Sequence, residues 1–217
     1  MGYETRVRSI FEEIPSQLQK HEKKFRLSSL KKEARFRDYK DALFWLDDAM
    51  IVNTCYNSTE PNVGLNLNSE RTTLKCYMAD TGLLLSHAFD EKAIVSQGLY
   101  PQLFERLEIN RGMLVENIVA QMLAASGHKL YFYSNSSRED AASRMEIDFL
   151  IASSTLPSRH NISPIEVKSG KNYTLSSLKK FMTKYAQMLR TPYVVHPKDM
   201  REEGGIVFLP YYMVPCL

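Results

Sequence analysis

The sequence predicts an α/β protein of the α+β kind, in which helices flank a mixed sheet and a small, mostly helical module comes first. Three observations favour this class. The length of 217 residues suits one large domain or one domain with a small appendage. Apolar residues recur at helical spacing over the first 50 residues. From about residue 104 the pattern changes to helix, three strands, helix and strand, the order of a mixed sheet covered by helices.

Two apolar stripes predict helices in the N-terminal module. A first amphipathic helix precedes Pro15, which is placed to open a second short helix because proline is tolerated in the first turn of a helix. A third helix is expected over residues 36–50. The stripes consist of Val7, Ile10, Phe11 and Ile14 in the first helix and of Tyr39, Leu43, Leu46 and Met50 in the third.

Shorter elements follow the third helix. An extended run covers residues 51–56, and a polar, turn-rich segment covers residues 57–70. A strand is then expected over residues 74–78, and a short helix over residues 81–88.

The C-terminal part combines long helical patterns with runs rich in β-branched and aromatic residues. The first helical pattern ends at Gly127, because glycine is a frequent C-cap residue. The predicted elements are a helix at 104–126, strands at 129–134, 145–152 and 162–168, a helix at 175–190, and short strands at 193–195 and 206–209.

The composition excludes several classes of protein. The formal net charge is only +3, so nucleic-acid binding has to be argued from local charge. No apolar run approaches the roughly 18 residues of a membrane span, and the first residues form no apolar leader. Three widely spaced cysteines and five scattered histidines fit neither a disulfide framework nor a zinc site. We therefore expect a cytoplasmic protein with no membrane partner.

Two predicted strands carry charged side chains in a pattern that favours a cation site. Period-two alternation places Glu146 and Asp148 on one face of the first strand, and Glu166 and Lys168 on one face of the second. The opposite face of the first strand consists of Ile147, Phe149 and Ile151. If residues 153–161 close a hairpin, Asp148, Glu166 and Lys168 come together.

A third carboxylate is expected on the helix that precedes these strands. Glu116 lies on an apolar face of that helix, and a buried carboxylate is costly unless it is paired or binds a metal. Its neighbours on this face are Met113, Val119, Ala120 and Leu123. Oxygen ligands suit Mg²⁺ or Mn²⁺. We therefore expect Asp148, Glu166 and Glu116 to bind the metal, and Lys168 to assist the attacking water.

Simpler interpretations of these residues remain open. The charged faces of the two strands could be a solvent-facing hairpin surface held by cross-strand ion pairs. Glu116 could be a half-buried helix residue paired with a lysine, and Glu146 is expected to be a surface carboxylate.

Two groups of basic residues are candidates for nucleic-acid contact. Residues 1–40 contain eleven Lys and Arg against six Asp and Glu, a surplus of five that exceeds the whole-chain net charge. The first group is Lys31, Lys32, Arg35, Arg37 and Lys40, and the second is Lys179, Lys180 and Lys184. Such residues would bind phosphates without sequence preference, although an ordinary solvated helix face explains either group equally simply.

The pattern of Glu116, Asp148 and the run Glu166-Val167-Lys168, on helix, strand and strand, resembles the PD-(D/E)xK nuclease superfamily. The resemblance covers residues 104–195 and implies a restriction-endonuclease-like fold. The acid-x-Lys spacing of that family is kept, whereas Ile147 replaces its usual proline.

A second resemblance covers nearly the whole chain. Its segments are residues 14–18, 23–25, 42–46, 75–84, 116–117, 146–149 and 164–170. They look like the C-terminal half of a prokaryotic family of predicted AAA-type ATPases. The resemblance implies that residues 1–75 are the end of the ATPase lid and a winged-helix-like module, and that residues 76–217 are the nuclease-like domain.

The chain departs from that ATPase family in one large respect. It contains no Gly-x-x-x-x-Gly-Lys-Ser/Thr phosphate loop, so we expect no ATP site. A fragment, a truncated gene product or a stand-alone remnant would each explain the missing phosphate loop. An ATPase portion or partner elsewhere is compatible with each of these.

The sequence therefore leads to three functional hypotheses. The leading one is a Mg²⁺- or Mn²⁺-dependent nuclease that acts on DNA. A catalytically silent DNA-binding or regulatory module of an ATPase system is the second, and a pure interaction scaffold is the third. A homo-oligomer is compatible with all three.

Overall fold

The structure is a computed structural model that confirms the expected α+β class. It describes residues 2–20, 23–62, 64–88, 111–135, 143–152, 161–170 and 172–217. The first seven residues of the helix expected at 104–126 lie outside these ranges, as does most of the expected turn at 153–161.

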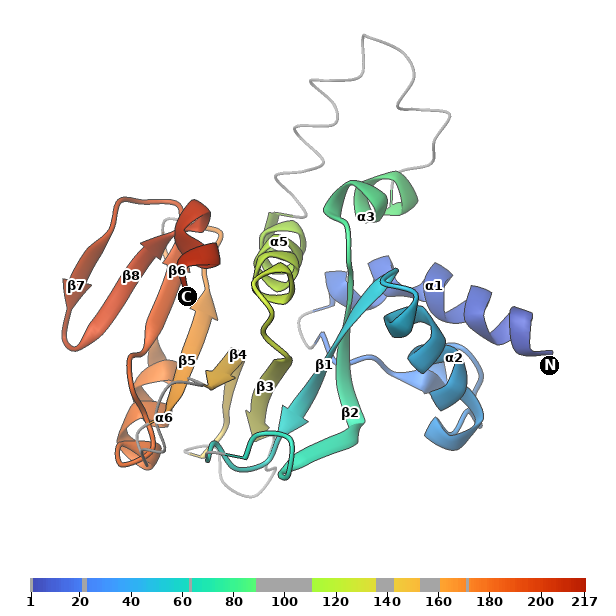
Figure 1. Cartoon of the computed structure of the whole chain (residues 1–217), viewed down its shortest axis with the longest axis horizontal. Helices are drawn as coiled ribbons and strands as arrows, with labels where there is room; N and C mark the ends of the chain where they lie inside the picture. Colours follow the sequence, from blue (N-terminus) through green and yellow to red (C-terminus); the bar gives the residue numbers. More distant parts are fainter. Residues whose placement is uncertain are drawn as a thin grey trace, which may run out of the picture. The chain divides into compact units, whose positions relative to one another are not determined.

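A mixed sheet runs through the described residues, with its strands in the order β2-β1-β3-β4-β5-β6-β8-β7 (Figure 1). The strands are β1 (Val52–Ser58), β2 (Ser69–Met78), β3 (Leu130–Asn135), β4 (Met145–Ala152), β5 (Ile162–Val167), β6 (Tyr193–His196), β7 (Arg201–Glu203) and β8 (Ile206–Pro210). The pairs β3–β4, β4–β5 and β7–β8 are antiparallel, whereas β1–β3, β5–β6 and β6–β8 are parallel. The expected order of helix, three strands, helix and strand is confirmed.

The chain divides into two compact units. The first contains residues 1–54 and 72–121, and the second contains residues 55–71 and 122–217. The module boundary expected at residue 75 falls within β2, and it stays a prediction.

The first unit is built around helices α1 (Tyr3–Gln19), α2 (Phe36–Asp48) and α3 (Thr81–Ala88), and it contains most of α5 (Arg111–Ala125). A short 3₁₀ turn, η1 (Leu27–Ser29), lies between α1 and α2. The expected apolar stripes supply the buried side chains of α1 and α2, among them Ile10, Ile14, Leu43 and Leu46.

The expectation that Pro15 opens a second helix is wrong, because α1 continues through it. A proline inside a helix has no N–H for the carbonyl four residues earlier, here that of Phe11. The ring of His87 on α3 supplies the missing donor. Its Nε2 lies 3.1 Å from the Phe11 carbonyl oxygen, and the two rings stack with their centroids 4.6 Å apart. A tertiary contact therefore replaces the lost backbone hydrogen bond.

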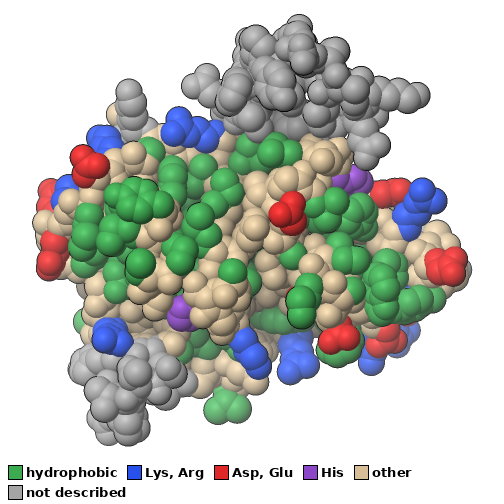
Figure 2. Space-filling view, turned by 45° about the horizontal axis from the view of Figure 1, so that its top comes forward, with side chains coloured by type: hydrophobic (Ala, Val, Ile, Leu, Met, Phe, Trp, Pro, Cys, Tyr) green, Lys and Arg blue, Asp and Glu red, His purple; other side chains and the backbone are tan. Residues whose placement is uncertain are grey.

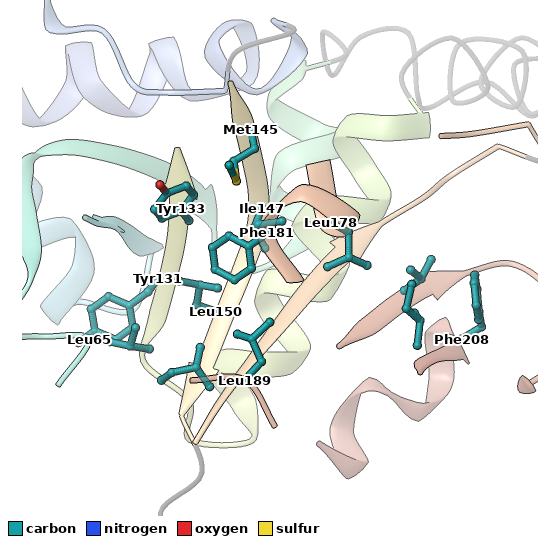
Figure 3. Close-up of a cluster of buried hydrophobic side chains, with 13 residues drawn as sticks. Leu65, Tyr131, Tyr133, Met145, Ile147, Leu150, Leu178, Phe181, Leu189 and Phe208 are labelled. Atoms are coloured by element: carbon teal, nitrogen blue, oxygen red, sulfur yellow. The ribbon is translucent and has the colours of Figure 1, made fainter. Parts of the chain in front are cut away.

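The second unit packs α6 (Ser176–Tyr185) against one face of its strands. Leu178 and Phe181 of this helix are fully buried against Ile147 and Leu150 of β4 (Figure 3). The C-terminal 3₁₀ helix η4 (Tyr211–Cys216) follows β8. The edge strand β7 was not expected, because its three residues are all charged and exposed. Charged edge strands resist pairing with other chains.

Within the described ranges, no helix has both the length and the apolar character needed to cross a membrane.

We predict that the contact between His87 and Phe11 stabilises α1 because Pro15 is present. His87→Ala should lower the free energy of unfolding by about 1–3 kcal/mol, since the Phe11 carbonyl loses its donor. In a Pro15→Ala background the backbone N–H returns, so the same His87 substitution should cost less. Urea denaturation of the four proteins in a double-mutant cycle measures this coupling. An equal cost of His87→Ala in both backgrounds would contradict the interpretation.

Candidate functional site

The antiparallel pairing of β4 and β5 brings the positions of Asp148 and Glu166 close together in the second unit. Phe149 pairs with Ile165 at one end of an unbroken register. Asp148 precedes Phe149 and Glu166 follows Ile165, so the two residues flank this last pair. The expected convergence of their carboxylates on a shared site stays a prediction.

A β-bulge interrupts β4 at this position. Between two successive register pairs, Tyr131 with Leu150 and Tyr133 with Ile147, β3 advances by two residues and β4 by three. One extra residue of β4 therefore lies opposite β3, which is the definition of a bulge. The expectation of strict alternation is wrong here, because Ile147 and Leu150 contribute to the same buried cluster under α6. Bulges often occur next to active sites, where they redirect a side chain.

The Asp148 side chain forms a hydrogen bond with the backbone of β5. The N–H of Val167 donates to Oδ2 of Asp148 over 2.8 Å. The N–H of Lys168, the next residue, donates to the carbonyl of Val195 in β6 over 2.8 Å. The Asp148 carboxylate is therefore held beside β5, where the register pairs between the two strands end.

Glu166 and Lys168 form a close ion pair at the end of β5. Nζ of Lys168 lies 2.8 Å from Oε2 of Glu166. The side chain of Glu166 is 5% exposed and that of Lys168 is 22% exposed, so the ammonium is the more accessible partner. The hydroxyl of Tyr211 in η4 donates to the backbone carbonyl of Lys168 over 2.8 Å. The backbone at Lys168 is therefore held on both sides, by β6 and by η4.

His196 lies at the end of β6 and was not singled out from the sequence. Val167 pairs with Val195, so the parallel register places His196 next to Lys168. Its ring is fully buried, with Nδ1 3.4 Å from the Tyr173 hydroxyl and Nε2 3.5 Å from Nη1 of Arg201. Burial and the Arg201 charge lower the pKa of His196, which favours the neutral imidazole. A lone histidine in a valine-rich strand gives no sequence signal for this environment.

The ligands that this site could offer a cation are the carboxylates of Asp148 and Glu166. Within the described residues, no group of three or more His, Cys, Asp and Glu side chains is arranged to hold a metal ion. Asp148 and Glu166 nevertheless fit the usual binding of Mg²⁺, which takes one or two carboxylates and completes its coordination with water and phosphate oxygens. The role of these residues as metal ligands stays a prediction.

Glu116 belongs to the first unit, where it is the centre of a buried ion-pair network. Nζ of Lys23 donates to its Oε2, while Nζ of Lys75 lies 3.4 Å from its Oε1. The hydroxyl of Tyr77 donates to the same Oε1 over 2.6 Å. The side chain of Glu116 is 5% exposed and that of Lys75 is 1% exposed. These contacts correspond to the simpler interpretation of Glu116 as a paired residue, and its role as a metal ligand stays a prediction.

The charges around Glu116 keep it ionised despite its burial. Burial alone would raise the pKa of this carboxyl. The nearby ammonium groups of Lys23 and Lys75, with hydrogen bonds from Lys23 and Tyr77, outweigh that effect and lower the pKa from 4.5 to about 2.

The polar stripe of α5 continues beyond Glu116. The side chain of Asn117 accepts from the Met78 N–H over 2.9 Å and donates to the Met78 carbonyl over 3.1 Å. Oε1 of Gln121 accepts from both the N–H and the hydroxyl of Thr81, at 3.0 and 2.8 Å. Together these bonds fix α5 to the end of β2 and the start of α3.

The basic candidates lie on the surfaces of their respective units. Lys31, Lys32 and Arg35 are exposed between η1 and α2, and Lys179 is exposed on α6. On the face drawn in Figure 2, Lys and Arg side chains are spread among apolar and acidic groups. Contact of these four residues with nucleic acid stays a prediction.

Two family descriptions match the chain, each over less than half of its length. A domain of unknown function (DUF8612) matches residues 3–93, and a domain of unknown function (DUF4143) matches residues 111–214. No curated protein and no solved structure matches the chain. Asp148, Glu166 and Lys168 all lie within the second match.

We predict that Glu116 contributes stability that depends on its charge. Glu116→Gln should lower the free energy of unfolding near neutral pH by about 3–5 kcal/mol, because Lys23 and Lys75 lose their buried counter-ion. The folded-state pKa lies below the ordinary 4.5, so this stability is present above pH 4.5 and is lost as the pH falls toward about 2. Urea denaturation of both proteins across this range should show a steeper loss in the wild type.

A matched control is Glu12→Gln in α1 of the same unit. Glu12 pairs with Arg8 at 3.1 Å, but the two side chains are 58% and 80% exposed. Removing that charge should cost less than about 1 kcal/mol. Parallel stability curves for wild type and Glu116→Gln between pH 4.5 and 2 would show that the network is not the source of the effect.

Proposed function

We propose that the second unit is a metal-dependent nuclease domain in which Asp148 and Glu166 hold Mg²⁺ or Mn²⁺ beside Lys168. One observation carries the proposal. The Asp148 carboxylate, in a bulged segment of β4, accepts from the Val167 N–H, and Val167 lies between Glu166 and Lys168, which form an ion pair. A solvent-facing hairpin surface would need neither the bulge nor the burial of Glu166.

The finer fold assignment is part of this proposal. The order α5-β3-β4-β5-α6-β6 agrees with a restriction-endonuclease-like core of the PD-(D/E)xK type. The acid-x-Lys run ends β5, where its backbone contacts position both functional groups. The fold alone does not establish an activity. The proposal is supported because the acid-x-Lys run also lies at the position in this element order where the nuclease family has it.

Each side chain has a distinct role in phosphodiester hydrolysis. A divalent cation bound at this site would polarise a phosphoryl oxygen and stabilise the charge on the leaving oxygen. Asp148 and Glu166 would hold that cation. The partly exposed ammonium of Lys168 would position the attacking water and offset the negative charge of the phosphate. Glu116 is not needed for this set, because its two lysines give it a structural role in the first unit.

We also propose that the substrate is DNA in a cytoplasmic setting and that an AAA-type ATPase portion or partner acts with the chain. The DUF4143 match supports the last point, because this domain is common in proteins associated with such ATPases. The cysteines Cys55, Cys76 and Cys216 are free thiols, as a reducing compartment would keep them. Exposed basic residues, including Lys31, Lys32, Arg35 and Lys179, would supply contacts to the phosphate backbone.

A second candidate is a catalytically silent DNA-binding or regulatory module. The contacts around the site favour it in one respect, since Asp148 already accepts from the Val167 N–H and Glu166 already pairs with Lys168. These contacts would also complete a site that never receives a metal. Salt-dependent DNA binding without any cleavage would support this module.

We predict that nicking of a supercoiled plasmid requires Mg²⁺ together with Asp148 and Lys168. Asp148→Asn and Lys168→Ala should each slow nicking by about 10²–10³-fold, because each removes a charge that stabilises the reacting phosphate. Gel electrophoresis of the relaxed plasmid over time measures the rate.

Lys198→Ala is the matched control, because Lys198 is an exposed lysine of the same unit that follows the end of β6. It should nick at the wild-type rate. Equal rates in all four proteins would place the activity at another site or in a contaminant, and the assignment of these residues would then be wrong.

A further inference from the structure

The second unit contains a cavity of about 530 Å³ between the end of β3 and the C-terminal half of α6. This volume lies within the usual range of small-ligand pockets, about 300–1,000 Å³. Its lining residues are Thr59, Glu60, Tyr133, Ser134, Asn135, Lys184, Tyr185 and Met188. None of them belongs to the carboxylate site.

The cavity lies on the same face of the sheet as the carboxylate site. Tyr133 pairs with Ile147, and both belong to the buried cluster under α6 (Figure 3). Glu166 pairs with Val194, another member of that cluster, so it points to the same face. Adjacent strands are about 4.8 Å apart, which places the cavity floor on β3 about 10 Å from β5.

The walls of the cavity combine aromatic rings, one cation and a polar rim. The hydroxyls of Tyr133 and Tyr185 lie 2.9 Å apart, and Phe181 supports both rings from behind at 5.1 and 4.8 Å between centroids. Tyr133 is buried, whereas Tyr185 is half-buried. Nζ of Lys184 lies 5.0 Å from the centre of the Tyr185 ring. Thr59, Glu60, Ser134 and Asn135 form the rim.

This combination matches the chemistry of a single nucleobase. An aromatic wall stacks on the face of a base, polar side chains bond to its edge, and a lysine contacts the adjoining phosphate. A base inside a duplex has both faces stacked and its edge paired, so it could enter only after it was flipped out. A cavity that encloses one base therefore selects nucleic acid with unpaired bases.

We propose that this cavity receives one unpaired base of the nucleic acid whose phosphodiester lies at Asp148, Glu166 and Lys168. This inference rests on the proposed function and adds the class of substrate. The preferred substrate is single-stranded, or it is a duplex with an unpaired stretch at the cleavage position. Tyr185 and Lys184 determine this preference, because they are the accessible aromatic and cationic groups of the cavity.

The test measures binding in the absence of metal, so that no cleavage occurs. A short oligonucleotide with one 2-aminopurine is titrated with the full chain, as a single strand and as a perfect duplex. We expect the single strand to bind about tenfold more tightly, since stacking of one base is typically worth a factor of about 5 to 160. Binding should also change the 2-aminopurine fluorescence of the single strand, which reports stacking directly.

Variants of the cavity separate stacking from charge. Tyr185→Ala should remove the fluorescence change and most of the preference for the single strand, whereas Tyr185→Phe keeps the ring and should keep both. Lys184→Ala should weaken binding of the single strand and reduce its salt dependence by about one phosphate contact. Lys198→Ala is the charge control and should behave like the wild type. Lys184 is exposed, so its substitution tests the cavity even if Tyr185→Ala unfolds.

Failure of this inference differs from failure of the proposed nuclease. Equal affinity for single strand and duplex, or unchanged binding in Tyr185→Ala and Lys184→Ala, would overturn the cavity as a base site, whatever the nicking assay shows. Preference for the single strand, lost in these variants, would uphold the cavity even if no cleavage is found. Such a result would overturn the nuclease activity alone.

Discussion

The geometry of the candidate site depends on one extra residue in β4. Between Ile147 and Leu150, β4 carries a residue that β3 does not pair, and Asp148 lies in this segment. The Asp148 carboxylate accepts from the Val167 N–H of β5, beyond the last register pair of β4 and β5. Backbone N–H groups need hydrogen-bond partners, and here a carboxylate is that partner. The bulged segment thus holds a carboxylate against the backbone of the neighbouring strand.

Two buried glutamates illustrate how differently the two units use a carboxylate. Glu116 in the first unit is surrounded by Lys23, Lys75 and Tyr77, which makes it a fixed counter-ion that joins three distant segments. Glu166 in the second unit pairs with the ammonium of Lys168, and that group is partly exposed. Removing charge from the first should mainly affect folding, whereas the partly exposed lysine beside the second meets a condition of the proposed contact with phosphate.

Much of the fold can be predicted from local sequence patterns, but the contacts between residues far apart in the sequence cannot. The strand at 145–152 and the element order around it were predictable, because alternation and turn residues are local signals. The bulge was not, since a period-two pattern cannot reveal one unpaired residue in a neighbouring strand. The donor that the Phe11 carbonyl receives in α1 comes from His87, 72 residues beyond Pro15, and the lysine partners of Glu116 lie 41 and 93 residues away from it. The apolar environment of Glu116 could signal that partners exist, but not which ones.

The most direct test of a metal site at the end of β4 and β5 is an anomalous difference map from crystals soaked in Mn²⁺. We predict a peak between the carboxylates of Asp148 and Glu166. The peak should lie close to the carboxylate oxygens, at about the 2.0–2.1 Å that is typical between Mg²⁺ and its oxygen ligands. Crystals of the Asp148→Asn variant should lose that peak. A map with no peak there, in which Asp148 still accepts from Val167 and Lys168 still pairs with Glu166, would contradict the assignment of this site to phosphodiester chemistry.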